Sequence, residues 1–122
     1  MLLQDFYTFQ IQNTDDSQVV ASVVLNKDHD VYKGHFPQIP ITPGVCQVLI
    51  IKELLSHVLG KSLQMLKSRD IKFLSMHNPT NEEALDVTIN YQNISDTTIS
   101  VNALISSNVT KILKFNGEFK SI

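Results

Sequence analysis

The chain of 122 residues has one cysteine and no cluster of lysine and arginine side chains. The lone Cys46 excludes an internal disulfide. Without a basic run, and with a formal net charge of −2, the chain lacks the positive surface that a phosphate backbone requires, so no nucleic-acid partner is expected. Only four glycines and four prolines accompany 43% hydrophobic residues, which excludes a collagen-like or disordered chain. We expect one packed domain over residues 1–122.

Long hydrophobic segments are also missing. The first ten residues, MLLQDFYTFQ, contain neither the basic stretch nor the extended apolar stretch of a secretory signal. The longest apolar stretch, residues 45–60, is interrupted by polar and charged side chains, whereas a membrane span needs roughly 20 apolar residues in a row. These features predict a cytoplasmic protein without membrane insertion.

Short runs of β-branched and aromatic residues predict strands in both halves of the chain. Residues 6–11 and 19–25 flank a polar turn segment and predict a hairpin. Residues 85–91 alternate apolar and polar side chains with the period of two that a half-buried strand shows. Further strands are expected at residues 71–74, 99–105 and 111–119. The strands of the C-terminal half are expected to form an antiparallel meander.

A proline-punctuated loop and an apolar segment separate the two sets of strands. Pro37, Pro40 and Pro43 each fix φ and remove a backbone donor, so no regular element is expected to pass through the loop. After it we predict a helix of about four turns. Thr42 is its expected N-cap, Pro43 its first residue and Gly60 the residue just beyond its end. Apolar side chains nearly encircle this helix, which indicates burial on most sides.

This order of elements predicts an α+β fold in which an antiparallel sheet wraps around one long central helix. A curved sheet on one helix leaves edge strands unpaired. Pairing with a second copy of the chain is a common way to cover them. A homodimer is therefore the default expectation, and higher oligomers remain open.

The segment GHFPQIPITPGV, residues 34–45, is the candidate for chemistry. Within it, His35 lies in the proline-stiffened loop just before the predicted helix. A histidine can remove or return a proton near neutral pH, and the unpaired N–H groups of a helix's first turn can bind a carbonyl oxygen that gains negative charge. Together these groups suit proton abstraction next to the carbonyl of an acyl thioester. A hydrogen-bonded structural histidine is the alternative interpretation of His35.

The pattern H-F-P-x-x-P-x-x-P-G-V before an apolar helix resembles the central motif of the 3-hydroxyacyl-acyl-carrier-protein dehydratases of fatty acid synthesis, which have the hot-dog fold. The matching residues are Gly34, His35, Phe36, Pro37, Pro40, Pro43, Gly44 and Val45. The resemblance implies that His35 removes a proton at C2 of a 3-hydroxyacyl thioester and that the Gly44 N–H polarises its carbonyl. It also implies a trans-2-enoyl product, a substrate carried on acyl carrier protein or coenzyme A, and no cofactor or metal.

The resemblance also implies a substrate-binding surface around the two catalytic residues. The side chains expected there are Phe36, Pro43, Val45, Gln47 and Leu49. The chain departs from the family at the last of these. The family's second catalytic residue is a Glu or Asp on the helix, fourteen positions after the histidine, which reaches across the dimer interface to protonate the departing hydroxyl. Leu49 occupies that position and cannot donate a proton.

Four other side chains have groups that could take part in chemistry. Glu53, one helical turn beyond Leu49, is either a substitute acid or a structural carboxylate. Gln47 suits substrate positioning better than acid catalysis. Cys46 is expected to be a buried packing residue, with a nucleophile as the alternative. His77 is expected in a loop, since the potential metal ligands near it are too few and irregularly spaced.

Three functions remain open from the sequence. The first is a hydro-lyase that dehydrates a 3-hydroxyacyl thioester. The second is a hot-dog thioesterase, which would direct a water molecule at the thioester. The third is a non-catalytic acyl-binding subunit paired with an active homologue, and Leu49 is its main support.

Overall fold

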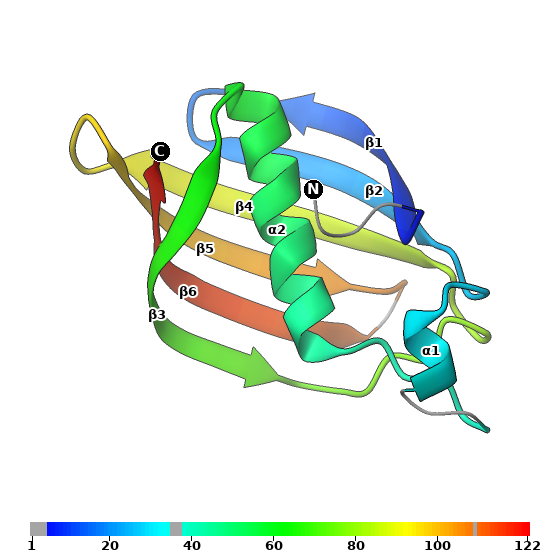
Figure 1. Ribbon diagram of the computed structural model, residues 1–122. Helices are drawn as coiled ribbons and strands as arrows, with labels where there is room; N and C mark the ends of the chain where they lie inside the picture. Colours follow the sequence, from blue (N-terminus) through cyan, green and yellow to red (C-terminus); the bar gives the residue numbers. More distant parts are fainter. Residues whose placement is uncertain (1–4, 35–37, 109) are drawn as a thin grey trace.

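A computed structural model describes residues 5–34, 38–108 and 110–122, shown in Figure 1. In chain order its elements are β1 (Tyr7–Thr14), β2 (Gln18–Leu25), α1 (Val31–Gly34), α2 (Gly44–Leu59), β3 (Leu63–Phe73), β4 (Ala84–Asn93), β5 (Thr98–Ser106) and β6 (Lys111–Ser121). The strands form one sheet in the order β1-β2-β4-β5-β6-β3, and every neighbouring pair is antiparallel. The expected α+β arrangement, an antiparallel sheet with a helix on it, is confirmed.

The helix α2 crosses one face of the sheet, and β3 bends from the end of α2 round to the far edge beside β6 (Figure 1). The pairing of β3 with β6 shifts register between Met65 and Lys67 and again between Ser68 and Asp70. Such irregularities increase the twist and bend of a strand. They explain how the sheet curls around the helix.

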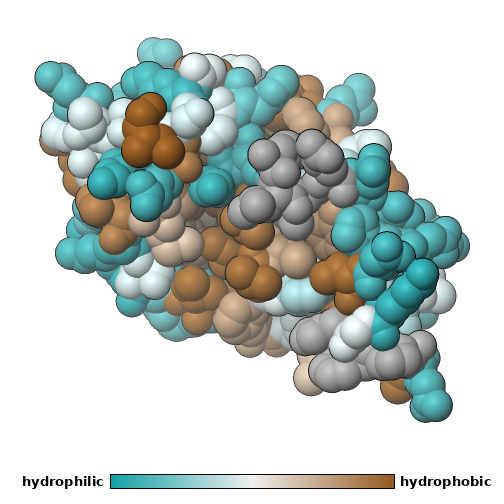
Figure 2. Space-filling model, viewed as in Figure 1, coloured by the Kyte–Doolittle hydropathy of each residue, from teal (hydrophilic) through white to brown (hydrophobic). Residues whose placement is uncertain are grey.

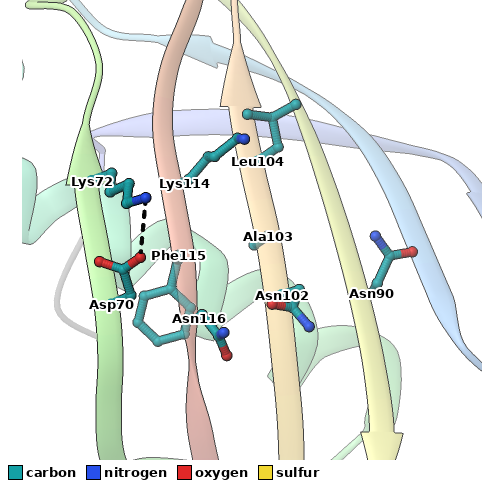
Figure 3. A pocket seen from close by; sticks show the side chains of 9 residues that line it. All are labelled: Asp70, Lys72, Asn90, Asn102, Ala103, Leu104, Lys114, Phe115 and Asn116. Atoms are coloured by element: carbon teal, nitrogen blue, oxygen red, sulfur yellow. Dashed lines mark ion pairs between the residues drawn. The ribbon is translucent and has the colours of Figure 1, made fainter.

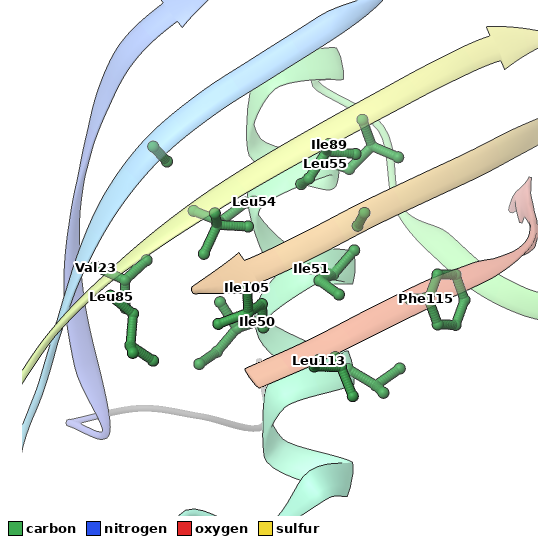
Figure 4. Packing of buried hydrophobic residues seen from close by; sticks show 14 of the residues in the cluster. Val23, Ile50, Ile51, Leu54, Leu55, Leu85, Ile89, Ile105, Leu113 and Phe115 are labelled. Carbon is green, nitrogen blue, oxygen red and sulfur yellow. The ribbon is translucent and has the colours of Figure 1, made fainter. Parts of the chain in front are cut away.

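Alternation along the strands builds the core. In β4 the inward residues are buried and their neighbours point to the opposite face, which is the period-two pattern expected for residues 85–91. The fully buried Ile50, Ile51, Leu54 and Leu55 of α2 pack against these inward side chains (Figure 4). Burying one such side chain contributes about 1.5–3 kcal/mol, so this seam fixes α2 on the sheet.

Several expectations about α2 need correction. The helix has sixteen residues, so it is a short helix and not a long one. Its N-cap is Pro43, with extended backbone and no side-chain cap, because the Thr42 hydroxyl is bonded to Tyr32 and His77 instead. Gly60, with φ of 65°, ends the helix as expected, since this left-handed conformation suits glycine.

The helix is also less enclosed than its apolar composition indicates. Seven of its sixteen residues are buried. Val45 is 68% exposed, and Leu49 and Glu53 along the same stripe are half-buried. No helix within the described ranges is long and apolar enough to cross a membrane.

Two elements were not predicted at their observed lengths. Strand β3 begins at Leu63, well before the expected residue 71, because it is an edge strand whose mostly exposed side chains show no period of two. The single turn α1 was not expected at all. It begins where the Val31 N–H donates to His29 Nδ1, a local bond that the composition does not reveal.

Candidate functional site

The expected base and its neighbour fall in a short gap in the described chain. His35, Phe36 and Pro37 lie outside the described residues. The chain on either side is described: α1 ends at Gly34, and the loop from Gln38 leads into α2. The roles assigned to His35 and Phe36 therefore stay predictions.

The expected carbonyl-binding group lies at the start of α2. Gly44 is the first residue of the helix. The Pro43 carbonyl oxygen accepts from the N–H groups of Cys46 at 3.1 Å and Gln47 at 3.2 Å. The N–H groups of Gly44 and Val45 have no acceptor within the described part of the chain. Unpaired donors at a helix start attract negative charge, which is the property a thioester oxyanion needs.

The ring of Phe73, at the end of β3, lies against this helix start. A methyl group added at Gly44 would come within 2.6 Å of Phe73 Cζ, so only a hydrogen fits beside the ring as it stands. Phe73 is nevertheless 61% exposed. The ring therefore forms one wall beside the Gly44 backbone while its other face remains open to solvent. No pattern in the sequence marks Phe73 as part of the site.

The other expected substrate-binding residues do not share one side of α2. Pro43 is buried at the N-cap, and Gln47 is 3% exposed on the core side. Val45 and Leu49, four residues apart, lie on the outer stripe of the helix. The residues expected to contact the substrate are therefore divided between the core side and the outer stripe of the helix.

Gln47 carries an unsatisfied polar atom. Its Nε2 donates to the Thr42 carbonyl oxygen at 3.3 Å. Its Oε1 is buried and has no donor among the described residues. An unpaired buried acceptor costs about 1–3 kcal/mol, so its retention in the first turn of α2 calls for an explanation beyond packing.

A chain of buried hydrogen bonds runs beside the helix start. Tyr32 Oη lies 3.0 Å from Thr42 Oγ1, which lies 2.8 Å from His77 Nδ1, and His77 Nε2 lies 2.6 Å from the Glu82 carbonyl oxygen. His77 is 2% exposed, and burial lowers its pKa. It lies in a loop as predicted, but its burial was missed because the flanking polar and proline residues give no sign of a core position.

Cys46 and Glu53 both have contacts that indicate structural roles. Cys46 is buried and burial raises the pKa of its thiol, which favours the packing role over a nucleophile. Glu53 is half-buried, and its Oε1 accepts a hydrogen bond of 2.8 Å from the Tyr7 hydroxyl. Burial and the adjacent Glu53 carboxylate raise the pKa of Tyr7. Glu53 thus has a structural partner, as its structural interpretation expected.

A separate depression of about 330 Å³ lies on the sheet face opposite α2 (Figure 3). The side chains around it are mainly lysines and asparagines, and Lys72 pairs with Asp70 across 3.6 Å. No residue of α2 lines it, and its polar side chains outnumber the apolar Ala103, Leu104 and Phe115, unlike the mainly apolar lining of a site for an acyl chain. Within the described ranges, no three His, Cys, Asp or Glu side chains are placed to hold a metal ion.

Solved structures of other proteins share the fold of this chain. A structure of the dehydratase heterocomplex ApeI:P from Xenorhabdus doucetiae aligns with a TM-score of 0.72 at 16% identity, covering 91% of this chain and 94% of that one. A hypothetical thioesterase with coenzyme A from Streptococcus pneumoniae aligns with a TM-score of 0.69 at 14% identity, covering 94% and 86%. A thioesterase from Pseudomonas aeruginosa aligns at 0.64 and 10%, covering 93% and 81%. These likenesses confirm the hot-dog fold.

Sequence comparison adds the family. A search of curated proteins finds no match. Residues 10–110 match the family described as ApeI-like, ApeI dehydratase, and this stretch includes the segment 34–45 and all of α2. Because the match extends over most of the chain, the protein belongs to the ApeI-like dehydratase family.

Proposed function

We propose that this protein is a dehydratase that converts a 3-hydroxyacyl thioester into a trans-2-enoyl thioester and water. The observation that carries the proposal is the ApeI-like dehydratase match over residues 10–110. The unpaired N–H groups at the start of α2 support it, because they suit a carbonyl oxygen that becomes negative during the reaction.

In the proposed reaction His35 takes a proton from C2 of the substrate. The electron pair moves onto the thioester oxygen, where the Gly44 N–H stabilises the negative charge. When the charge returns, the C2–C3 double bond forms and the C3 hydroxyl leaves with a proton as water. His35 thus supplies the base, and Gly44 supplies the N–H that donates a hydrogen bond to the oxyanion. The residues proposed to contact the substrate are Phe36, Pro43, Val45, Gln47 and Leu49.

The proton for the departing hydroxyl needs a source other than Leu49. The Glu53 carboxylate already accepts a hydrogen bond from the Tyr7 hydroxyl, which favours its structural interpretation. Two sources remain: the protonated His35 itself, or an acid on a partner subunit. The ApeI:P structure is described as a dehydratase heterocomplex, which supports the second source.

The substrate carrier is proposed to be acyl carrier protein or coenzyme A. A structural neighbour was solved with coenzyme A, which supports a thioester with a pantetheine arm. The reaction itself moves only a proton and a hydroxyl, so the proposed mechanism calls for no cofactor.

A thioesterase is the second candidate, because two of the three structural neighbours named above are described as thioesterases. The two reactions leave different products. Dehydration yields an enoyl thioester, whose conjugated double bond absorbs in the ultraviolet, while hydrolysis yields a free thiol.

The experiment that tests the proposal measures both products with the purified protein. Straight-chain 3-hydroxyacyl thioesters of acyl carrier protein and of coenzyme A serve as substrates. We expect enoyl absorbance to grow without release of thiol. Release of thiol without enoyl product would assign the thioesterase function instead. If a folded protein forms neither product, the result would contradict both enzymatic functions and favour the acyl-binding subunit.

A further inference from the structure

The connection from α1 to α2, which includes His35, is bridged by a buried hydrogen bond between residues on either side of it. Tyr32, in α1, and Thr42, just before the N-cap of α2, bring their hydroxyl oxygens to 3.0 Å. Their exposed fractions are 4% and 3%. The described ends of the loop are therefore held together where water does not compete for the hydroxyl groups.

The loop between β3 and β4 completes this junction. The Thr42 N–H donates to the His77 carbonyl oxygen at 2.8 Å, and the Thr42 hydroxyl lies 2.8 Å from His77 Nδ1. The opposite ring nitrogen of His77 bonds to the Glu82 carbonyl oxygen. One imidazole thus connects the base of the motif loop to a segment far along the chain.

The direction of these bonds follows from the chemistry of the groups. A carbonyl oxygen can only accept, so His77 Nε2 carries the proton that it shares with Glu82. In a neutral imidazole Nδ1 is then an acceptor, and the Thr42 hydroxyl donates to it. Thr42 Oγ1 in turn accepts from the Tyr32 hydroxyl. One neutral tautomer of His77 satisfies every bond in the chain.

We propose that Tyr32, Thr42 and His77 form a clamp that positions the loop carrying His35, and that this clamp closes only while His77 is neutral. The inference rests on the proposed function of His35. The three residues act through the loop and touch no reacting atom, so they are positioning residues.

If Nδ1 of His77 were protonated, it would face the Thr42 hydroxyl proton, donor against donor. The Thr42 hydroxyl would have to turn away, and the direction of the hydrogen bonds would reverse. Thr42 would then donate to Tyr32, whose own hydroxyl proton would lose its acceptor. The titratable groups near the chain are Glu82, whose charge favours protonation of His77, and the Cys46 thiol beside Tyr32. Burial outweighs Glu82 and lowers the pKa of His77. The stability that the neutral ring contributes is therefore complete above the unfolded-state pKa of about 6.5 and is lost as the pH falls below it.

The test compares variants that keep or remove single hydroxyl groups. Thr42→Val removes the hydroxyl at nearly constant shape, and Thr42→Ser retains it. Tyr32→Phe removes the other hydroxyl, and Tyr91→Phe is its control, because the Tyr91 hydroxyl bonds to Asp15 O outside the clamp. We expect kcat to fall about tenfold or more in Thr42→Val and Tyr32→Phe, with KM within about twofold. Thr42→Ser and Tyr91→Phe should stay near wild type.

A second readout needs no activity. The ¹⁵N shifts of His77 in the wild-type protein should show a proton on Nε2 near neutral pH. Amide exchange in residues 38–43 should quicken in Thr42→Val and Tyr32→Phe but not in Tyr91→Phe. If wild type has no dehydratase activity, the proposed function fails while these two measurements still decide whether the clamp exists. A proton on Nδ1, unchanged exchange in both variants, or a Thr42→Ser enzyme as slow as Thr42→Val would overturn the clamp.

Discussion

A methyl group added at Gly44 would have different neighbours from one added at Gly117. At Gly44 the group approaches the tip of the exposed Phe73 ring. At Gly117, inside the sheet, it approaches the Lys67 carbonyl oxygen at 2.5 Å and the buried Phe115 ring at 2.8 Å. A ring tip can swing aside, whereas the backbone of a paired strand cannot.

Gly117→Ala should therefore lower the free energy of unfolding by about 1–3 kcal/mol, as overpacking of a core does. Gly44→Ala should change it by no more than about 1 kcal/mol, because alanine's higher helix propensity offsets the displaced ring. Urea unfolding of both variants checks this order. A larger loss for Gly44→Ala than for Gly117→Ala would contradict the placement of Phe73.

Gln47→Leu should separate stability from activity. Replacing the amide removes a buried acceptor that has no donor among the described residues, so the free energy of unfolding should stay within about 1 kcal/mol of wild type or rise. If Oε1 accepts a hydrogen bond from the substrate, kcat/KM should fall about tenfold.

Gln18→Leu is the matched control for Gln47→Leu, because Gln18 bonds to Asn90 on the exposed sheet face. Its kcat/KM should not change. A Gln47→Leu protein that loses stability but keeps its kcat/KM would make Gln47 a structural residue only.

Single residues also mark the limit of sequence analysis at the site. The motif singled out Gly44 and Gln47 because helix starts and amides have recognisable chemistry. It gave no sign of Phe73 or of the partners of Thr42, since these depend on where β3 and the loop after it end in space. Contacts between segments that far apart along the chain leave no local pattern.

Among the elements, α2 decides the proton-donor question. Its outer stripe carries Val45, Leu49 and Glu53, and none of them is fully buried. A polar side chain at position 49 is therefore compatible with the fold, in contrast to positions 50 and 51 beside it, which are fully buried.

Leu49→Glu should raise kcat for dehydration by about tenfold or more, since a positioned acid contributes roughly 10²–10⁴-fold in favourable cases. Leu49→Gln has nearly the same shape but cannot donate a proton efficiently, so it should give no gain. Enoyl absorbance measures both variants. An equal effect of Glu and Gln would show that proton donation at this position is not limiting.

The elements also show where pattern analysis succeeds. Strand β4 was predicted closely, because one face is buried and the other exposed, which produces the alternation. The first part of β3 was missed, because an exposed edge strand with register shifts has no such alternation. The N-cap was misplaced by one residue because the Thr42 hydroxyl is used in tertiary bonds.

The whole molecule presents an edge strand with apolar side chains. Strand β3 lies at one edge of the sheet and has a neighbouring strand on one side only. On this strand the Leu66 side chain is 48% exposed, and Met76, shortly after the end of β3, is 83% exposed. Hydrophobic surface appears beside hydrophilic surface on the face that carries α2 (Figure 2). Such an edge favours pairing with a second copy, which supports the proposed homodimer.

Sedimentation should show a dimer for the wild-type protein. Leu66→Asp should weaken it at least about tenfold, or about 1.4 kcal/mol, because a charge would be buried at the edge. Val24→Asp is the control, since Val24 is 43% exposed but lies on β2, away from β3. Dissociation by Val24→Asp alone would move the interface to the other edge of the sheet.

The central claim is that His35 is the base of a dehydration reaction. The most direct measurement compares wild type with His35→Ala on a 3-hydroxyacyl thioester, with thermal unfolding used to verify that the fold is retained. We predict enoyl product from wild type and a rate at least about 100-fold lower from His35→Ala. A folded His35→Ala protein that forms enoyl product at the wild-type rate would contradict the account.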